Sequence, residues 1–219
     1  MKISTAVSVG LALAGITTSA PLTARTTKTA AQIILEIATT SGTCLSSNKE
    51  CHTNMQVGPL MAKAAAQYKV DHASPIAAVL ALTAFESADY AYNTNQQLTA
   101  GQGTSNMQMY TYNLKYAQSI PALSDPLNKL GTPDALLAAS TANPPNAALM
   151  NSVRDLVTTD DYNFGSGFWF LTTQCGSDVI QKLKDNPDAG FAAYMGCVGV
   201  TINDKRQDYW TKAKQAFGL

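Results

Sequence analysis

Apolar residues recur along most of the chain at intervals of three and four positions, which is the spacing of one face of an α-helix. In the segment 28–40, Ile33, Ile34 and Ile37 share one face, and Gly42 follows as a stop signal. Strict alternation of apolar and polar residues, the mark of a half-buried strand, is not the dominant pattern. The spacing therefore predicts a mainly α protein.

Start signals place the predicted helices more closely. Gly58-Pro59 opens a helix in this reading, and Ser74-Pro75 opens the next, with a capping serine and a proline in the first turn. The polar stretch "NTNQQLTAGQGTSNMQM", residues 93–109, predicts a loop or a short β-hairpin. Proline-bearing stretches around 121–133 and 144–145 are read as connections. Further helices are predicted at 112–119, 133–140, 146–158, 167–174, 188–195 and 204–217, the last with Asn203 as its cap.

The N-terminus has the pattern of a secretory signal peptide. A basic start at Lys2 precedes an apolar stretch over 3–16, and the small residues "TTSA" end at Ala20. We expect residues 1–20 to be removed and 21–219 to form one domain of a secreted, extracellular protein, with a second trimming after Arg25 left open. No later stretch is long enough for a transmembrane helix, so no membrane partner is expected after cleavage.

Charge and cysteine content refine this picture. Fifteen Lys and Arg balance fifteen Asp and Glu, which gives no reason to expect a nucleic acid or an anionic membrane as a partner. Four cysteines fit an exported protein and allow three pairings. We favour the local pairing, Cys44 with Cys51 and Cys175 with Cys197. A zinc site would need tighter spacing such as CxxC, so no metal is expected.

Glu86 is the candidate for chemistry. It follows Val79, Leu82 and Thr83 on a largely apolar stripe and closes the helix that starts at Ser74. Burial and a helix C-terminus both disfavour negative charge there, which favours the protonated form that a general acid needs. The alternative reading is an ordinary surface charge at a frayed helix end.

The residues after Glu86 suggest a family. A helix that ends in Glu86-Ser87, then Gly103, then Met107-Gln108 resembles the core of the lysozyme superfamily, in particular soluble lytic transglycosylases and goose-type lysozymes. The stretch "AYMG" around Tyr194 is weakly similar to an Ala-Tyr-Asn-rich helix of these enzymes. Residues 164–175, "FGSGFWFLTTQC", look like a segment of a group of secreted fungal proteins.

The resemblance implies a lysozyme-like α domain with a short β-hairpin or loop segment after the catalytic helix. Glu86 would protonate the glycosidic oxygen, Gln108 would line the cleft, and Met107 would pack beneath it. Aromatic rings and planar amides suit a saccharide cleft. The substrate-binding residues expected on this basis are Ser87, Asp89, Asn93, Gln102, Asn106, Gln108, Tyr110 and Tyr194. A second carboxylate would come from Asp89, Asp71 or the pair Asp160-Asp161, which the sequence does not rank.

The sequence-based hypothesis is therefore a secreted, monomeric, antibacterial glycoside hydrolase of the lysozyme or muramidase type. It would cleave the glycan strands of bacterial peptidoglycan, with chitin oligomers as a further polysaccharide substrate, and would need no cofactor. Two alternatives stay open: cleavage of the lytic transglycosylase type, and a non-catalytic secreted glycan-binding or interaction protein on the same fold.

Overall fold

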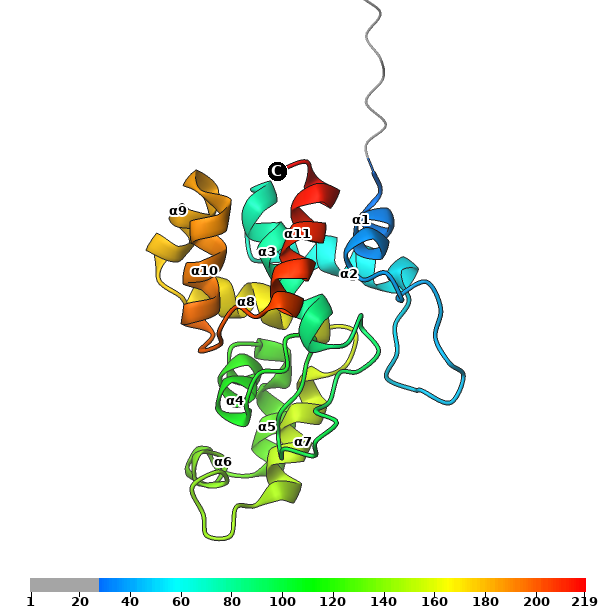
Figure 1. The fold of residues 1–219 in the computed structure, drawn as a ribbon. Helices are drawn as coiled ribbons and strands as arrows, with labels where there is room; N and C mark the ends of the chain where they lie inside the picture. The colour runs from blue at the N-terminus through cyan, green and yellow to red at the C-terminus, as the bar shows by residue number, and fades with distance from the viewer. Residues whose placement is uncertain (1–27) are drawn as a thin grey trace, which may run out of the picture.

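The computed structural model describes residues 28–219, and Figure 1 shows helices joined by turns and loops. The predicted mainly α fold is confirmed. The proposed signal peptide and the trimming site at Arg25 lie outside the described residues, so secretion stays a prediction. The elements are α1 (Ala30–Ile37), α2 (Asn54–Gln67), α3 (Ala73–Glu86), α4 (Tyr110–Gln118), η1 (Pro121–Leu123), α5 (Ser124–Leu130), α6 (Pro133–Ala138), α7 (Ala147–Val157), η2 (Asn163–Gly165), α8 (Ser166–Thr173), α9 (Ser177–Asp185), α10 (Pro187–Cys197) and α11 (Asp204–Phe217).

Two helix starts differ from the prediction. Helix α2 begins at Asn54, because Thr53 and Gln56 form a capping box there, and Pro59 lies inside the helix. Helix α3 begins at Ala73, and Ser74 does not cap it. The Ser74 hydroxyl instead donates a 2.6 Å hydrogen bond to the carbonyl of Leu183 in the last turn of α9, so this serine joins two helices.

Two helices were missed by the sequence analysis. Helix α5 lies in a stretch that the prolines marked as a connection, but its Pro126 falls in the first turn, where proline costs no intrahelical bond. Helix α9 follows Gly176 and buries Val179 and Leu183 while its charged residues face outward. The Asn203 cap of α11 is confirmed, because its side chain accepts a hydrogen bond from the Arg206 amide.

Helix α3 is the centre of the larger hydrophobic cluster. Every position from Ala77 to Ala84 is buried, as expected for a helix that is apolar on all sides. It packs most extensively against α11 and also contacts α1, α8, α9 and α10. Figure 1 shows α3 and α11 side by side in the upper part of the molecule. Glu86, the last residue of this surrounded helix, is half-buried.

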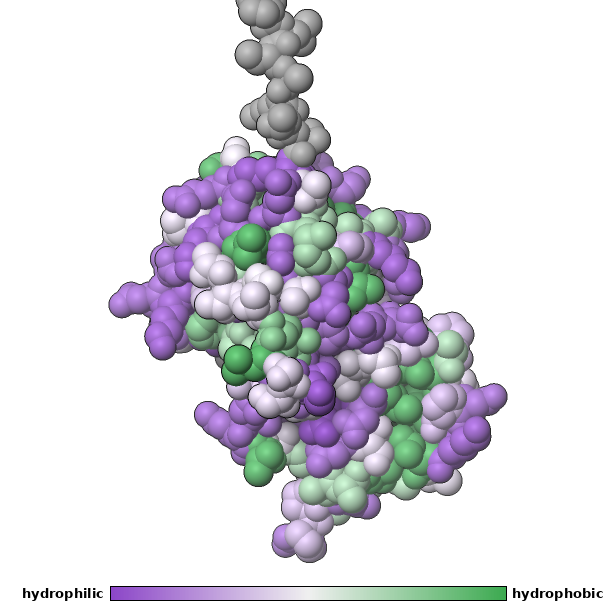
Figure 2. Space-filling view, turned by 90° about the vertical axis from the view of Figure 1, so that its right-hand side faces the viewer, coloured by the Kyte–Doolittle hydropathy of each residue, from purple (hydrophilic) through white to green (hydrophobic). Residues whose placement is uncertain are grey.

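A smaller cluster is formed by α4, α5, α6 and α7 in the lower part of Figure 1. Helix α8 belongs to both clusters: Phe168 and Leu171 lie in the cluster around α3, whereas Trp169 and Phe170 lie in the smaller one. On the face in Figure 2, hydrophilic residues are interspersed with hydrophobic ones, and the latter gather along one side of the lower part. The two clusters leave a cleft between them, which is described below.

The predicted loop or hairpin at 93–109 is a folded loop. Within residues 28–219, β-pairing is limited to two isolated bridges, Thr94 with Gly103 and Gly103 with Gln108. Three of its non-glycine residues adopt left-handed backbone conformations: Leu98, Thr104 and Met107. Such conformations are uncommon outside glycine, so the surrounding contacts must hold the loop in place.

Two disulfides and one terminal contact complete the fold. The bonds Cys44–Cys51 and Cys175–Cys197 are formed, which is the local pairing that we favoured. The first lies in the connection between α1 and α2, and the second joins the segment after α8 to the end of α10. At the other side of the molecule, Lys28 Nζ donates a 3.3 Å hydrogen bond to the carbonyl of Ala216, so the first described residue lies beside the last helix.

Candidate functional site

Glu86 lies at the C-terminal end of α3 in an ion pair. Its Oε1 is 2.8 Å from Nη2 of Arg206, which comes from the first turn of α11. The two side chains are 21% and 15% exposed, respectively. Arg206 also donates to the Thr201 carbonyl at 3.1 Å and lies over the Phe85 ring, 4.5 Å from its centroid. The carboxylate is therefore held by a cation that is itself fixed on two further sides.

Tyr194 on α10 lies close enough to Glu86 for the negative charge of the carboxylate to affect the pKa of the Tyr194 hydroxyl. Burial, together with the negative charge of Glu86, raises the pKa of the Tyr194 hydroxyl above its ordinary value. The side chain is fully buried, and its hydroxyl has no hydrogen-bond partner within residues 28–219. A buried hydroxyl without a partner is unusual and costs stability.

A chain of side-chain amides forms the opposite wall. Gln108 Nε2 donates to Asn113 Oδ1 at 2.8 Å, and Asn106 Nδ2 donates to Gln108 Oε1 at 3.2 Å. Asn106 Oδ1 in turn accepts from the hydroxyls of Thr104 and Ser166, both at 2.8 Å. These groups are buried, so the network stabilises the loop and fixes the orientation of its amides.

Glu86, Arg206 and the amide chain border one cleft with a volume of about 280 Å³. It lies between the two hydrophobic clusters, and Leu82, Met107 and Tyr112 contribute apolar walls. Among the predicted site residues, the structure brings together Glu86, Gln102, Asn106 and Gln108 around this cleft. Ser87, Asp89, Asn93, Tyr110 and Tyr194 do not line it.

Those five residues have structural partners or lie in the core. The Ser87 hydroxyl donates to the Thr83 carbonyl and accepts from the Tyr90 amide, which closes the end of α3. The Tyr110 hydroxyl donates to the Leu136 carbonyl at 2.6 Å, and Asn93 Nδ2 donates to the Thr158 carbonyl at 3.2 Å. Asp89 is 7% exposed and accepts three hydrogen bonds, from the Thr40 amide, the Thr40 hydroxyl and the Tyr209 hydroxyl.

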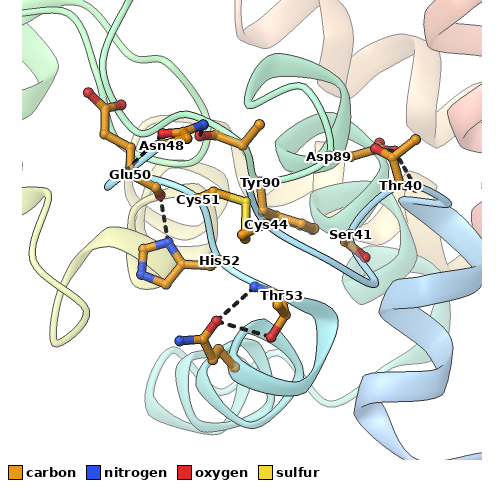
Figure 3. Close-up of a disulfide and its surroundings, with 12 residues drawn as sticks. Thr40, Ser41, Cys44, Asn48, Glu50, Cys51, His52, Thr53, Asp89 and Tyr90 are labelled. Atoms are coloured by element: carbon orange, nitrogen blue, oxygen red, sulfur yellow. Dashed lines mark hydrogen bonds between the residues drawn. A yellow bond between two sulfur atoms is a disulfide. The ribbon is translucent and has the colours of Figure 1, made fainter. Parts of the chain in front are cut away.

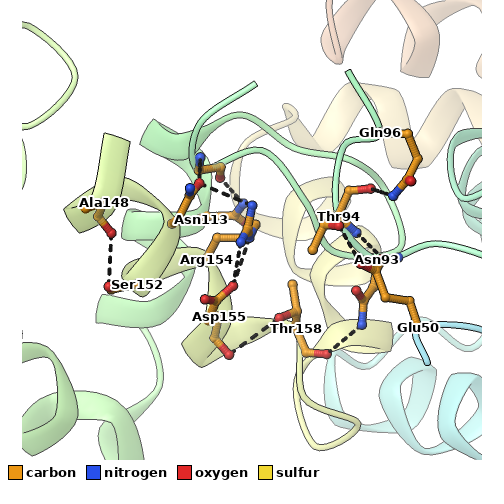
Figure 4. Close-up of polar contacts among 12 residues, drawn as sticks. Glu50, Asn93, Thr94, Gln96, Asn113, Ala148, Ser152, Arg154, Asp155 and Thr158 are labelled. Atoms are coloured by element: carbon orange, nitrogen blue, oxygen red, sulfur yellow. Dashed lines mark hydrogen bonds and ion pairs between the residues drawn. The ribbon is translucent and has the colours of Figure 1, made fainter. Parts of the chain in front are cut away.

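Glu50 supports the loop that lines the cleft, and the sequence analysis missed it. Its carboxylate accepts hydrogen bonds from the amides of Asn93 and Thr94, at 2.9 and 3.0 Å, and from the Thr94 hydroxyl at 2.7 Å (Figure 4). Glu50 lies within the loop closed by the Cys44–Cys51 disulfide bond, directly before Cys51, in the α1–α2 connection (Figure 3). The disulfide loop is thus fastened to the loop that forms the cleft wall.

A second concavity, hereafter the apolar groove, lies at the opposite end of the α3–α11 pair. It has a volume of about 470 Å³ and no residue in common with the cleft. Its walls come from α1, α2, the first half of α3 and the end of α11, with Ile33, Met61, Ala65, Leu80 and Phe217 among the apolar residues. The run of small residues in α2 was the available sequence signal, and the sequence analysis derived no site from it.

Two negative observations hold for residues 28–219. No group of three or more His, Cys, Asp or Glu side chains lies together in an arrangement that could hold a metal ion. None of the helices in this part of the chain has the length and apolar character needed to cross a bilayer.

Comparisons with known proteins give one informative match. The chain is similar to a protein of Fusarium oxysporum (strain Fo5176) named bifunctional dioxygenase (DOX)-epoxy alcohol synthase (EAS), with 42% identity over 166 residues. The match covers 75% of this chain but 12% of the relative, so the chain spans only a small part of the relative's length. No profile of a known protein family matches the chain. No solved structure matches it either.

This match overturns the predicted function. The relative is named for dioxygenase and epoxy alcohol synthase activities and not for the cleavage of glycosidic bonds. The prediction of a peptidoglycan-cleaving glycosidase, with its lytic transglycosylase and glycan-binding alternatives, is therefore wrong. The catalytic role of Glu86 depended on that function and is not proposed, and the geometry gives this carboxylate a cationic partner in Arg206 instead. The lysozyme-like resemblance of the fold was not tested by these comparisons and stays a prediction.

Proposed function

We propose that this protein binds an oxygenated apolar small molecule, of the epoxy alcohol class, in the apolar groove. The groove itself carries the proposal. Its volume of about 470 Å³ falls within the range of small-molecule sites, roughly 300–1,000 Å³. Such sites combine predominantly apolar walls with a few polar groups that orient the ligand.

The apolar part of the ligand would lie between α1 and α2. Ile33 and Ile34 of α1 and Ala62, Ala65 and Ala66 of α2 all line the groove. The three alanines leave space that larger side chains would fill, and burying a chain of methylene groups there contributes about 0.8 kcal/mol for each one. This composition favours an extended hydrocarbon over a polar ligand.

The polar part of the ligand would lie at the groove's rim, which carries one cation and one anion. Lys69 and Asp71 both border the groove and are exposed, and they follow the end of α2. An ammonium group donates hydrogen bonds, which suits an epoxide oxygen, and a carboxylate accepts them, which suits a hydroxyl. An epoxy alcohol offers both groups, and the relative's name supports this class of ligand. Because the chain matches 12% of that relative, the proposal is one of binding and not of the relative's catalysis.

Isothermal titration calorimetry tests the proposal. A long-chain epoxy alcohol, kept below its micelle-forming concentration, should bind the protein, and the alkane of equal length should bind roughly tenfold more weakly. Ala62→Phe should fill the groove and weaken epoxy alcohol binding by about tenfold or more. Ala148→Phe, at an exposed position of α7, is the matched control and should leave binding unchanged. The proposal fails if the wild-type protein gives no binding heat, or if both phenylalanine variants bind like the wild type.

A further inference from the structure

We propose that the cleft beside Glu86 is a second and separate binding site, which takes a neutral planar ligand that carries a primary amide on an apolar body. The inference does not depend on the apolar groove, because the two concavities share no residue. It follows from which hydrogen-bonding groups at the cleft have a partner within the protein and which have none.

Several side chains around the cleft donate hydrogen bonds within the protein, whereas Nε of Arg206 is buried and has no hydrogen-bond partner within residues 28–219. Arg206 donates through Nη2 to Glu86 and through Nη1 to the Thr201 carbonyl. Gln102 Nε2 donates to the Met107 carbonyl at 2.9 Å. The amide nitrogens of Asn106 and Gln108 donate along the chain of amides described above. Each of these side chains is therefore held in place by the bond that it donates.

Two acceptors are left over. Within residues 28–219, neither Oε2 of Glu86 nor Oε1 of Gln102 accepts a hydrogen bond, and both side chains are half-buried at the cleft. A carboxylate has capacity for about four hydrogen bonds, and the bond from Arg206 uses one of them. A ligand that complements these two acceptors must therefore bring donors. A primary amide brings two N–H groups on one planar nitrogen, one for each acceptor.

The charges around the cleft favour a neutral donor over a cationic one. Arg206 already compensates the charge of Glu86 at 2.8 Å. A ligand cation would therefore find the charge of Glu86 already compensated and would be repelled by Arg206, whereas a neutral amide avoids this repulsion.

The walls suit a flat apolar body behind the amide. Leu82, Met107 and Tyr112 border the same cleft as the two acceptors. Tyr112 is held edge-on against Phe170, with ring centroids 4.8 Å apart, so its orientation is fixed before a ligand arrives. Preorganised walls reduce the entropy lost on binding.

Three probes of nearly equal shape separate the contributions. Benzamide carries the two donors, acetophenone keeps the carbonyl but replaces the amino group by methyl, and benzoate carries a negative charge. NMR titrations would follow the Gln102 side-chain amide signals and the backbone amides of Gly103 and Gly199. Benzamide should shift these signals in a saturable manner, acetophenone should bind about tenfold more weakly, and benzoate should not bind. Equal binding of benzamide and acetophenone, or no binding of benzamide at millimolar concentration, overturns the proposal.

A reversal of specificity gives the sharper test. In Glu86→Gln, the new amide oxygen should face Arg206, so its N–H₂ group would point into the cleft and turn an acceptor into a donor. The variant should therefore lose its preference for benzamide and bind acetophenone at least as well. Glu36→Gln is the control, since Glu36 is also paired with a cation, Lys28, but lies on α1 away from the cleft. An unchanged benzamide preference in a folded Glu86→Gln protein contradicts the proposal.

Discussion

The Tyr209 hydroxyl donates a 2.6 Å hydrogen bond to one carboxylate oxygen of Asp89, and so joins α11 to the turn that follows α3. The other oxygen of Asp89 accepts from both the amide and the hydroxyl of Thr40 in the turn that follows α1. Asp89 also has a left-handed backbone, with φ of 59°. One buried carboxylate thus connects three segments that are distant in the sequence.

Asp89→Asn should lower the free energy of unfolding by about 1–3 kcal/mol. Asparagine tolerates the left-handed backbone, so the loss would come from replacing the carboxylate. The amide N–H₂ group would face either Tyr209 or Thr40, both of which donate hydrogen bonds to Asp89. Urea denaturation measures the change. Asp161→Asn, at an exposed position, should change stability by less than about 0.5 kcal/mol. Equal stabilities of the two variants would argue against this role of Asp89.

Glu50→Gln should loosen the cleft wall. The substitution removes the negative charge that accepts three hydrogen bonds from Asn93 and Thr94, at a cost of about 1–3 kcal/mol. Amide hydrogen exchange at these two residues should become faster, while exchange in α3 stays slow. Glu36→Gln, which breaks an exposed ion pair, should leave exchange in the loop unchanged. Slow exchange at Thr94 in the Glu50 variant would mean that other contacts hold the loop.

Tyr194→Phe should be neutral or stabilising near pH 7, because the hydroxyl that it removes has no partner among the described residues. Tyr116→Phe is the matched comparison: its buried hydroxyl donates to the Tyr162 carbonyl at 2.8 Å, so its loss should cost about 1 kcal/mol. Thermal denaturation at pH 7 distinguishes the two. A large destabilisation in Tyr194→Phe would indicate that its hydroxyl has a partner in solution.

Tyr194 also predicts a pH dependence. Burial and the charge of Glu86 raise the pKa of its hydroxyl in the folded protein. Above the unfolded-state pKa of about 10, the unfolded chain releases this proton while the folded chain keeps it, so unfolding becomes more favourable as pH rises. The contribution of this hydroxyl to the free energy of unfolding is therefore fully present below about pH 10 and is lost as the pH rises above it. Wild-type protein should lose stability more steeply than Tyr194→Phe in denaturation curves between about pH 10 and 11.5. If the wild type and Tyr194→Phe lose stability in parallel, the raised pKa of the Tyr194 hydroxyl is contradicted.

The two disulfides should contribute unequally. Their cysteines are separated by 22 residues in Cys175–Cys197 and by 7 residues in Cys44–Cys51. Loop-closure entropy then gives about 3 kcal/mol for the longer loop and about 2 kcal/mol for the shorter one. Paired Cys→Ala variants, compared in urea, should rank in this order. The reverse order would show that contacts within the short loop, including those of Glu50, outweigh chain entropy.

Gly58→Ala should separate α1 from α2. A Cβ at this position would lie 2.5 Å from the backbone nitrogen of Ala31, a contact that only a shift of one helix can relieve. We expect a loss of about 1–3 kcal/mol. Gly196→Ala in α10 is the control, because its Cβ would meet no atom within 4 Å, and a helical Gly→Ala change should stabilise by about 0.5–1 kcal/mol. Calorimetric melting temperatures that move in the same direction would contradict this difference.

The sequence predicted the parts of this structure that depend on nearby residues. Helical spacing located most of the helices, and the Asn203 cap was found because it bonds an amide three residues away. Ser74 was misread because its acceptor, the carbonyl of Leu183, is 109 residues distant, so a local capping rule assigned it the wrong partner. Glu50 escaped notice for the same reason, since its partners lie 43 and 44 residues further on.

The site was harder to predict than the fold. The sequence grouped Glu86, Gln102, Asn106 and Gln108 correctly around one cleft, but it could not reveal that Arg206, 120 residues away, occupies one oxygen of Glu86. The apolar groove needed the packing of four helices, and no short motif marks such a surface. Motif-based reasoning therefore supplied a chemistry for the cleft that the comparison with the Fusarium protein contradicts.

The hydrogen bond between Lys28 and the Ala216 carbonyl has an architectural consequence. A polypeptide that enters this unit at α1 leaves it at almost the same point, beside the end of α11. A host protein could therefore accommodate the whole helical unit within a single surface loop, with little change in the distance between the two ends of that loop. The fold is thus suited to being carried as an insertion in a much longer chain.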